Sequence, residues 1–162
     1  MKMTGLDGVL DTLRKLPPEV VSKKGGPVLR SLRKGASVLV KQARENFHAE
    51  ALDPGKSGIN QITGFTEKAI VARRRAPPPG ERGERVVVTV LPRTHPGGRQ
   101  YRGRTIKAND IAFIMEVGSS TQPAAPWLRP AYAAKKGEAM RVIEKTLVGD
   151  VNRIVARLSK GK

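Results

Sequence analysis

Apolar residues recur at steps of three and four in three stretches of the chain, and this spacing predicts three amphipathic helices. The first covers about residues 5–16 and ends before Pro17-Pro18. The second covers about 27–50 and the third about 130–158. In the third helix the apolar stripe consists of Met140, Ile143, Leu147, Val151, Ile154 and Leu158.

The second predicted helix carries two stripes, so one side should pack against the domain and the other should face solvent. The apolar stripe consists of Leu29, Leu32, Ala36, Leu39, Ala43 and Phe47. The cationic stripe consists of Arg30, Lys34, Lys41 and Arg44.

Three shorter apolar runs between these helices are interpreted as strands, at about 69–75, 85–91 and 110–117. The run 85–91 is β-branched almost throughout and does not alternate with polar residues, so we expect both of its faces to be covered. The order of elements predicts a single α+β domain over residues 1–162. In this fold an antiparallel sheet packs against two N-terminal helices and a long C-terminal helix.

Two segments rich in Pro, Gly and Arg, 76–84 and 93–108, contain too few apolar residues to fold alone. We expect them to be flexible arms that become ordered on assembly.

The composition narrows the class of protein. Hydrophobic residues make up 38% of the 162, and no cysteine is present, which excludes disulfides and Cys-based zinc sites. No apolar stretch is long enough to span a membrane, and the N-terminus does not resemble a secretory signal, so we expect synthesis in the cytosol. The formal net charge of +17 predicts an acidic partner, either nucleic acid or an acidic protein surface.

Residues with catalytic potential are few, and the sequence predicts neither an enzyme nor a cofactor. The two histidines, His48 and His95, lie on separate elements without a metal-ligand spacing, so both are predicted at the surface. Glu116 is the one carboxylate within an apolar run. A single carboxylate does not define a catalytic mechanism. We expect Glu116 to form an ion pair or a subunit contact with an arginine.

Clustered basic residues are the remaining candidates for contact with DNA or with an acidic partner. They are Arg73, Arg74, Arg75, Arg99, Tyr101, Arg102 and Arg104. No helix-turn-helix, RRM, KH or zinc-finger signature accompanies them, so any DNA contact should be non-specific.

A family resemblance rests on two segments. Phe113, Glu116, Gly118 and Ser119 are similar to an aromatic-x-x-Glu-x-Gly-Thr motif, with Ser in place of Thr. Pro126, Trp127, Leu128, Arg129, Pro130 and Ala131 are similar to a Pro-Phe-Leu-Arg-Pro-Ala motif, with Trp in place of Phe. Together they resemble the hallmark of the neck and tail-completion proteins of lambda-like long-tailed bacteriophages. Weaker similarity extends over most of the chain, but the basic insert near Arg99 departs from the family.

The resemblance implies a virion structural protein that forms a ring of six or twelve copies at the head–tail junction and joins the tail to the DNA-filled head. It implies head-closure, tail-terminator or tail-tube proteins as neighbours, with genomic DNA as a further contact. Trp127 should fill either the domain core or a pocket of the next subunit, and the core is favoured.

Two alternatives stay open. One is the tail-terminator ring, which belongs to the same functional class. The other is a free nucleic-acid-binding protein, which should bind duplex DNA as a monomer or dimer with a steep salt dependence. A neck subunit should instead bind free DNA weakly or not at all.

Overall fold

The computed structural model describes residues 26–52, 64–81, 83–94, 100–101 and 103–160. Four helices and four strands lie in these ranges. They are α3 (Gly26–Leu52), α4 (Phe65–Ala69), β1 (Ile70–Arg75), β2 (Arg85–Val90), β3 (Gln100–Tyr101), β4 (Arg104–Thr105), α5 (Ala108–Val117) and α6 (Leu128–Lys160). The mixed α+β class is confirmed. The helix predicted at about 5–16 lies outside the described residues.

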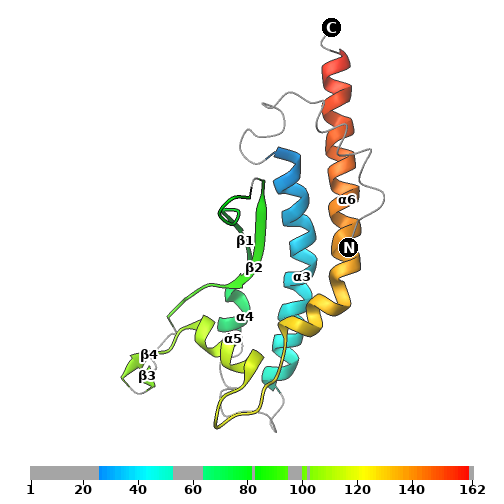
Figure 1. Cartoon of the computed structure of the whole chain (residues 1–162). Helices are drawn as coiled ribbons and strands as arrows, with labels where there is room; N and C mark the ends of the chain where they lie inside the picture. The colour runs from blue at the N-terminus through cyan, green and yellow to red at the C-terminus, as the bar shows by residue number, and fades with distance from the viewer. Residues whose placement is uncertain (1–25, 53–63, 82, 95–99, 102, 161–162) are drawn as a thin grey trace.

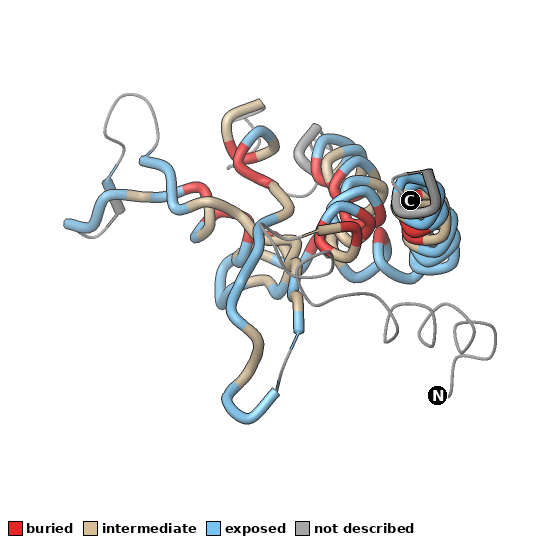
Figure 2. Tube along the Cα trace, turned by 90° about the horizontal axis from the view of Figure 1, so that it is seen from above, coloured by how far each residue is buried: buried red, intermediate tan, exposed pale blue. Residues whose placement is uncertain are grey.

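Helix α3 is the central layer of the molecule. The long helix α6 runs antiparallel to it on one side, and the β1–β2 hairpin covers another side (Figures 1 and 2). At about 1.5 Å per residue, the 33 residues of α6 span about 50 Å and the 27 residues of α3 about 40 Å. The C-terminal turns of α6 therefore extend beyond the start of α3.

The contact between α3 and α6 depends on small residues. Gly35 is buried in α3, and a Cβ atom built on it would lie 2.3 Å from Cγ1 of Ile143 and 2.9 Å from the carbonyl oxygen of Ala139. Ala36 and Ala139 are also buried. A glycine at this position lets the two backbones approach closely, which a larger side chain would prevent.

The sheet is smaller than predicted. Strands β1 and β2 pair antiparallel from Ile70↔Val90 to Arg75↔Arg85, which confirms the predicted strands at 69–75 and 85–91. The third predicted strand is absent from the sheet, and α6 packs on α3 and not on the sheet, contrary to the prediction. The inner face of the hairpin packs on α3, but neither face of 85–91 is fully covered, so the prediction of a strand buried on both faces is also wrong. Val86 to Val90 are only half-buried.

Residues 110–117 form most of helix α5, and the predicted strand there is wrong. A short apolar run does not distinguish a buried strand from a helix by its pattern alone. The buried positions Ile111, Ala112 and Met115 share one helical face, and the side chain of Asp110 accepts a hydrogen bond from the Lys107 N–H at 3.1 Å. This contact at the first turn favours the helix.

The core lies where the second half of α3, the start of β1, α5 and the start of α6 meet. Its buried members are Val40, Ala43, Phe47, Ile70, Ile111, Ala112, Met115, Trp127 and Ala131. The predicted arm 93–108 contains a second hairpin, β3–β4, which projects from this end of the molecule (Figure 1).

Candidate functional site

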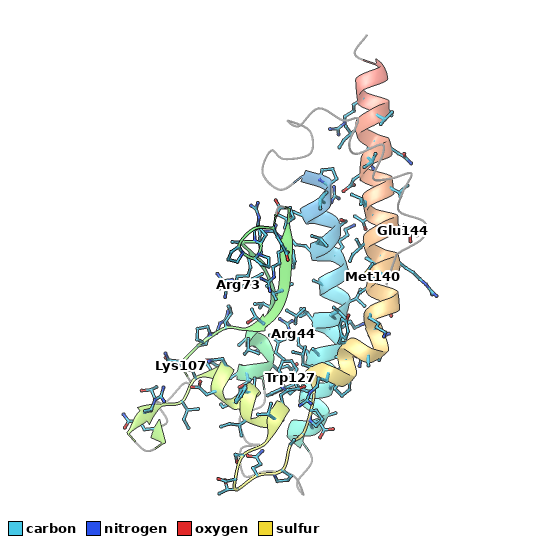
Figure 3. All side chains as sticks on the ribbon, in the orientation of Figure 1. Arg44, Arg73, Lys107, Trp127, Met140 and Glu144 are labelled. Atoms are coloured by element: carbon cyan, nitrogen blue, oxygen red, sulfur yellow. The ribbon has the colours of Figure 1, made fainter. Side chains whose placement is uncertain are left out.

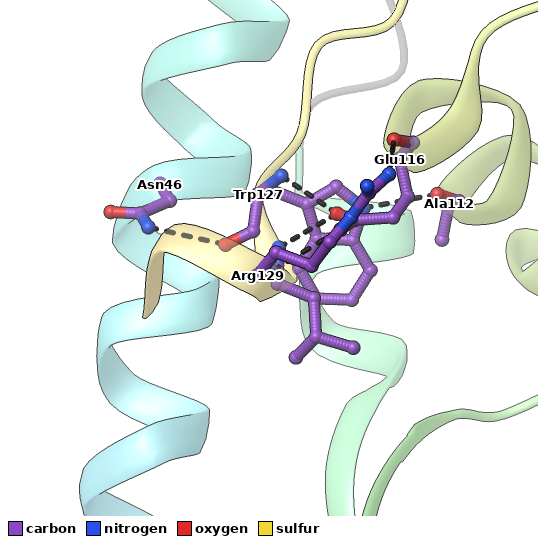
Figure 4. A network of polar contacts seen from close by, with 6 residues as sticks. Asn46, Ala112, Glu116, Trp127 and Arg129 are labelled. Atoms are coloured by element: carbon purple, nitrogen blue, oxygen red, sulfur yellow. Dashed lines mark hydrogen bonds and ion pairs between the residues drawn. The ribbon is translucent and has the colours of Figure 1, made fainter. Parts of the chain in front are cut away.

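The two halves of the hallmark meet at the start of α6 (Figure 4). Oε2 of Glu116 accepts hydrogen bonds from the N–H groups of Trp127 and Leu128, both at 2.8 Å. Oε1 accepts from the N–H of Arg129 at 3.2 Å. Position 130 is a proline and has no N–H. One carboxylate and one proline therefore account for the N–H groups that a helix leaves unpaired at its start. We name Glu116, Trp127, Leu128 and Arg129 the Glu116 clasp.

The side chain of Arg129 closes the clasp from the solvent side. Its Nε donates to Oε1 of Glu116 at 2.9 Å, and its Nη2 donates to the Glu116 carbonyl oxygen at 3.0 Å. The arginine side chain is 70% exposed, whereas that of Glu116 is only 13% exposed. The expected ion pair between Glu116 and an arginine is confirmed, although the glutamate lies on a helix and not on a strand.

The clasp keeps Glu116 ionised. Burial raises the pKa of its carboxyl, but the hydrogen bonds from Leu128, Arg129 and Trp127 lower it and together outweigh the burial. The pKa therefore lies below its ordinary value. A carboxylate at the N-terminus of α6 also interacts favourably with the helix dipole. With four donors on its two oxygens, Glu116 serves as a helix cap.

Trp127 is a core residue, as favoured from the sequence. It is 3% exposed, and its ring packs edge-on against Phe47 with centroids 5.5 Å apart. Its Nε1 donates to the Ala112 carbonyl oxygen at 3.0 Å, and its own carbonyl accepts from Nδ2 of Asn46 at 3.1 Å. The tryptophan thus ties α3, α5 and α6 together.

Gly118 ends α5 and allows the chain to return to the clasp. Its φ of +79° is in the left-handed region, and its N–H donates to the Ile114 carbonyl at 2.7 Å. A Cβ at this position would lie 2.9 Å from the backbone nitrogen of Ala124. Both observations require glycine. Ser119 pairs with Gln122 in the turn that follows, and its side chain is exposed, like Pro126 and Pro130.

Phe113 points away from this centre. It is 66% exposed on the outer side of α5, with Val117 one turn further along and also exposed.

The run Arg73 to Arg75 is divided between the two faces of the hairpin. Side chains alternate along a strand, and Ile70, Ala72, Val88 and Val90 face α3 and the core. Arg74 lies on this inner face, where it forms two hydrogen bonds of 2.7 and 2.6 Å with the carboxylate of Glu84. Arg73 and Arg75 lie on the outer face, and the register places Arg85 directly opposite Arg75. We name Arg73, Arg75 and Arg85 the arginine face.

The other basic candidates do not join the arginine face. Arg104 is exposed on β4, which belongs to the separate β3–β4 sheet, below the β1–β2 hairpin in Figure 1. Arg99 and Arg102 lie outside the described residues, and for Tyr101 the structure describes the backbone alone.

Some residues of both sites have no signal in the sequence. Asn46 and Ala112 support Trp127 through contacts that depend on tertiary packing. Arg85 joins the arginine face because of the hairpin register, which could have been anticipated only with the strand pairing known.

Other chemistry is sparse in the part of the chain that the structure describes. No group of three or more His, Asp or Glu side chains there could hold a metal ion. His48 is exposed, as predicted, and its Nδ1 lies 3.1 Å from Oε2 of Glu67; His95 lies outside the described residues. No helix in these ranges has the length and apolar character that a membrane crossing requires.

Comparison of the chain with protein-family models, with curated proteins and with solved structures found no match.

Proposed function

We propose that this protein is a virion structural subunit of the head–tail junction of a long-tailed bacteriophage, where copies form a ring that joins the tail to the filled head. The Glu116 clasp carries the proposal. Residues 116 and 127–129 lie in different helices or at their ends but form one hydrogen-bonded cap, so these four hallmark residues belong to one structural element.

The surface is suited to a subunit of an assembly. A closed ring requires two different patches on each copy that fit each other. Phe113 and Val117 on α5 and Tyr132 on α6 are large apolar side chains left exposed, and the β3–β4 hairpin projects from the body (Figure 1). Exposed apolar groups of this kind are typical of protein interfaces. The net charge of +17 would then be balanced by genomic DNA or by neighbouring head-closure, terminator or tube proteins.

Particles produced without the gene test the proposal. We expect electron micrographs to show filled heads beside separate, unjoined tails, and supply of the protein in trans should restore joined particles. Wild-type particles should contain the protein in a fixed number of copies, six or twelve, at the junction. Normal infectious particles without the gene would overturn the proposal.

The same experiment distinguishes a neck protein from a tail-terminator ring, which is the nearest alternative. A tail-terminator ring should give tails of uncontrolled length when it is missing, whereas loss of a neck protein leaves tails of normal length. A free nucleic-acid-binding protein should be absent from purified particles.

A further inference from the structure

We propose that the arginine face binds a nucleic-acid phosphate backbone, without sequence preference and with about three phosphate contacts for each copy of the chain. The inference goes beyond ring formation and does not depend on it, because it rests only on how the β1–β2 hairpin arranges its charges.

The first argument is the concentration of like charge. Same-face residues on a strand are about 6.6 Å apart, and directly opposed residues have Cβ atoms about 5 Å apart. Arg73, Arg75 and Arg85 therefore leave the sheet from one small patch, with Arg75 and Arg85 facing each other. Like charges directly opposite on a sheet destabilise it. A bound polyanion would remove this repulsion.

The second argument is that the fold leaves these arginines available. Arg74 between them is neutralised by Glu84, and Arg44 of α3 donates two hydrogen bonds to the Ile70 carbonyl oxygen, at 3.1 and 2.7 Å. Figure 3 shows Arg44 between α3 and the base of the hairpin and Arg73 on the side away from α3. Arg73, Arg75 and Arg85 are exposed, and none of the three forms an ion pair with another described residue.

The third argument distinguishes phosphate from an acidic protein surface. A protein interface needs a desolvated apolar centre. The exposed large apolar residues of the described chain are Phe113, Val117, Tyr132, Met140 and Val155, all on α5 or α6 and none on the hairpin. On the outer face, Val71, Val87 and Thr89 are half-buried beside the arginines. Exposed planar guanidinium groups beside apolar side chains that are only half-exposed suit phosphate oxygens, which accept bidentate hydrogen bonds.

Three contacts predict weak binding by one copy. The logarithm of the binding constant should fall against the logarithm of salt concentration with a slope of about −2.7 from this face, which is about a 40-fold loss of affinity between 50 and 200 mM salt. Weak binding by a single copy agrees with the expectation that a neck subunit binds free DNA weakly. Several copies around one DNA molecule would bind it more tightly through multivalency.

The test compares matched variants of the full chain. Binding to a fluorescent 30-base-pair duplex is measured by anisotropy over this salt range for three proteins: wild type, Arg73→Gln/Arg75→Gln/Arg85→Gln, and the control Arg33→Gln/Arg141→Gln/Lys145→Gln. The control removes the same charge from exposed positions on α3 and α6. We expect the hairpin variant to lose about 2.7 from the slope and the control to lose much less. The single variant Arg85→Gln should lose about 0.9.

Equal losses in both triple variants would overturn the inference, because net charge alone would then explain binding. The partner assignment is tested with a poly-glutamate peptide that carries the same number of negative charges as the DNA duplex. Tight binding of that peptide through the arginine face, with DNA bound equally by all three proteins, would make an acidic protein the partner and overturn the inference. The mass of the assembled species, measured separately, tests ring formation, so either proposal can fail while the other stands.

Discussion

The arginines near the core and those of the arginine face serve opposite purposes. Near the core, Arg44 binds the Ile70 carbonyl, and Arg129 closes the Glu116 clasp. Further along the hairpin, Arg73, Arg75 and Arg85 share one exposed face without a described acidic partner. The same residue type therefore stabilises the fold in one region and costs stability in the other. The difference shows that arginines have two situations in this protein: some hold elements of the fold together through hydrogen bonds, and others are exposed without a described acidic partner.

The largest expected effect is at the packed end. Trp127→Ala should lower the free energy of unfolding by about 4 kcal/mol, because it removes a buried ring and leaves a cavity between three helices. Urea denaturation followed by circular dichroism measures it. Trp127→Phe is the matched control, since it keeps most of the packing and loses only the Nε1 hydrogen bond to Ala112. It should lower the free energy of unfolding by about 1 kcal/mol. A similar small loss in both variants would mean that the ring does not hold this end together.

The next largest effect is expected at the Glu116 clasp, which caps α6. Glu116→Gln should cost about 2 kcal/mol at neutral pH, because a neutral amide replaces an ionised acceptor of four hydrogen bonds. Glu138→Gln, in an exposed i,i+3 pair with Lys135, should have no measurable effect.

The pH dependence of the cap follows from the direction of the pKa shift. The pKa of Glu116 is lower in the folded than in the unfolded chain, so its stabilisation is fully present above the unfolded pKa. It is lost as the pH falls through the folded pKa. The stability difference between wild type and Glu116→Gln should therefore shrink as the solution is acidified through that range. A difference independent of pH would show that the charge of Glu116 is not what caps α6.

A smaller effect directly contrasts the two kinds of arginine. Arg44→Gln should lower stability by about 1 kcal/mol, because the two hydrogen bonds from the half-buried Arg44 side chain to the Ile70 carbonyl oxygen are lost. Arg73→Gln should leave stability unchanged within about 0.5 kcal/mol, since its side chain lies on the open face. Chemical denaturation of both variants measures the difference, and equal losses would remove the distinction between the two regions.

The smallest expected effect is an increase in stability, where the preceding substitutions lower it or leave it unchanged. Arg75→Glu should raise stability by about 0.5 kcal/mol, because it replaces repulsion across the Arg75↔Arg85 pair with attraction. The thermal midpoint should rise while affinity for duplex DNA falls. Destabilisation by this substitution would indicate that the arginines already have partners in the free protein.

The long helices α3 and α6 and the β1–β2 hairpin are predictable from the residues alone, because helical periodicity over many turns and a β-branched run are local signals. Helix α6 begins two residues before the predicted start at 130, and α3 extends only slightly past its predicted limits. The charge of the chain, its lack of cysteine and the pairing of Glu116 with an arginine were also readable from the residues.

The other features of the fold and of the two sites depend on contacts between elements. Residues 110–117 became helix α5 because burial of one helical face against the core outweighs a local pattern that fits either structure. The strand register placed Arg85 beside Arg75 and turned Arg74 toward Glu84. Glu116 can cap α6 only because the turn at Gly118 brings the end of α5 to the start of α6. Contacts between distant residues depend on packing geometry, which the order of residues encodes only through the whole fold.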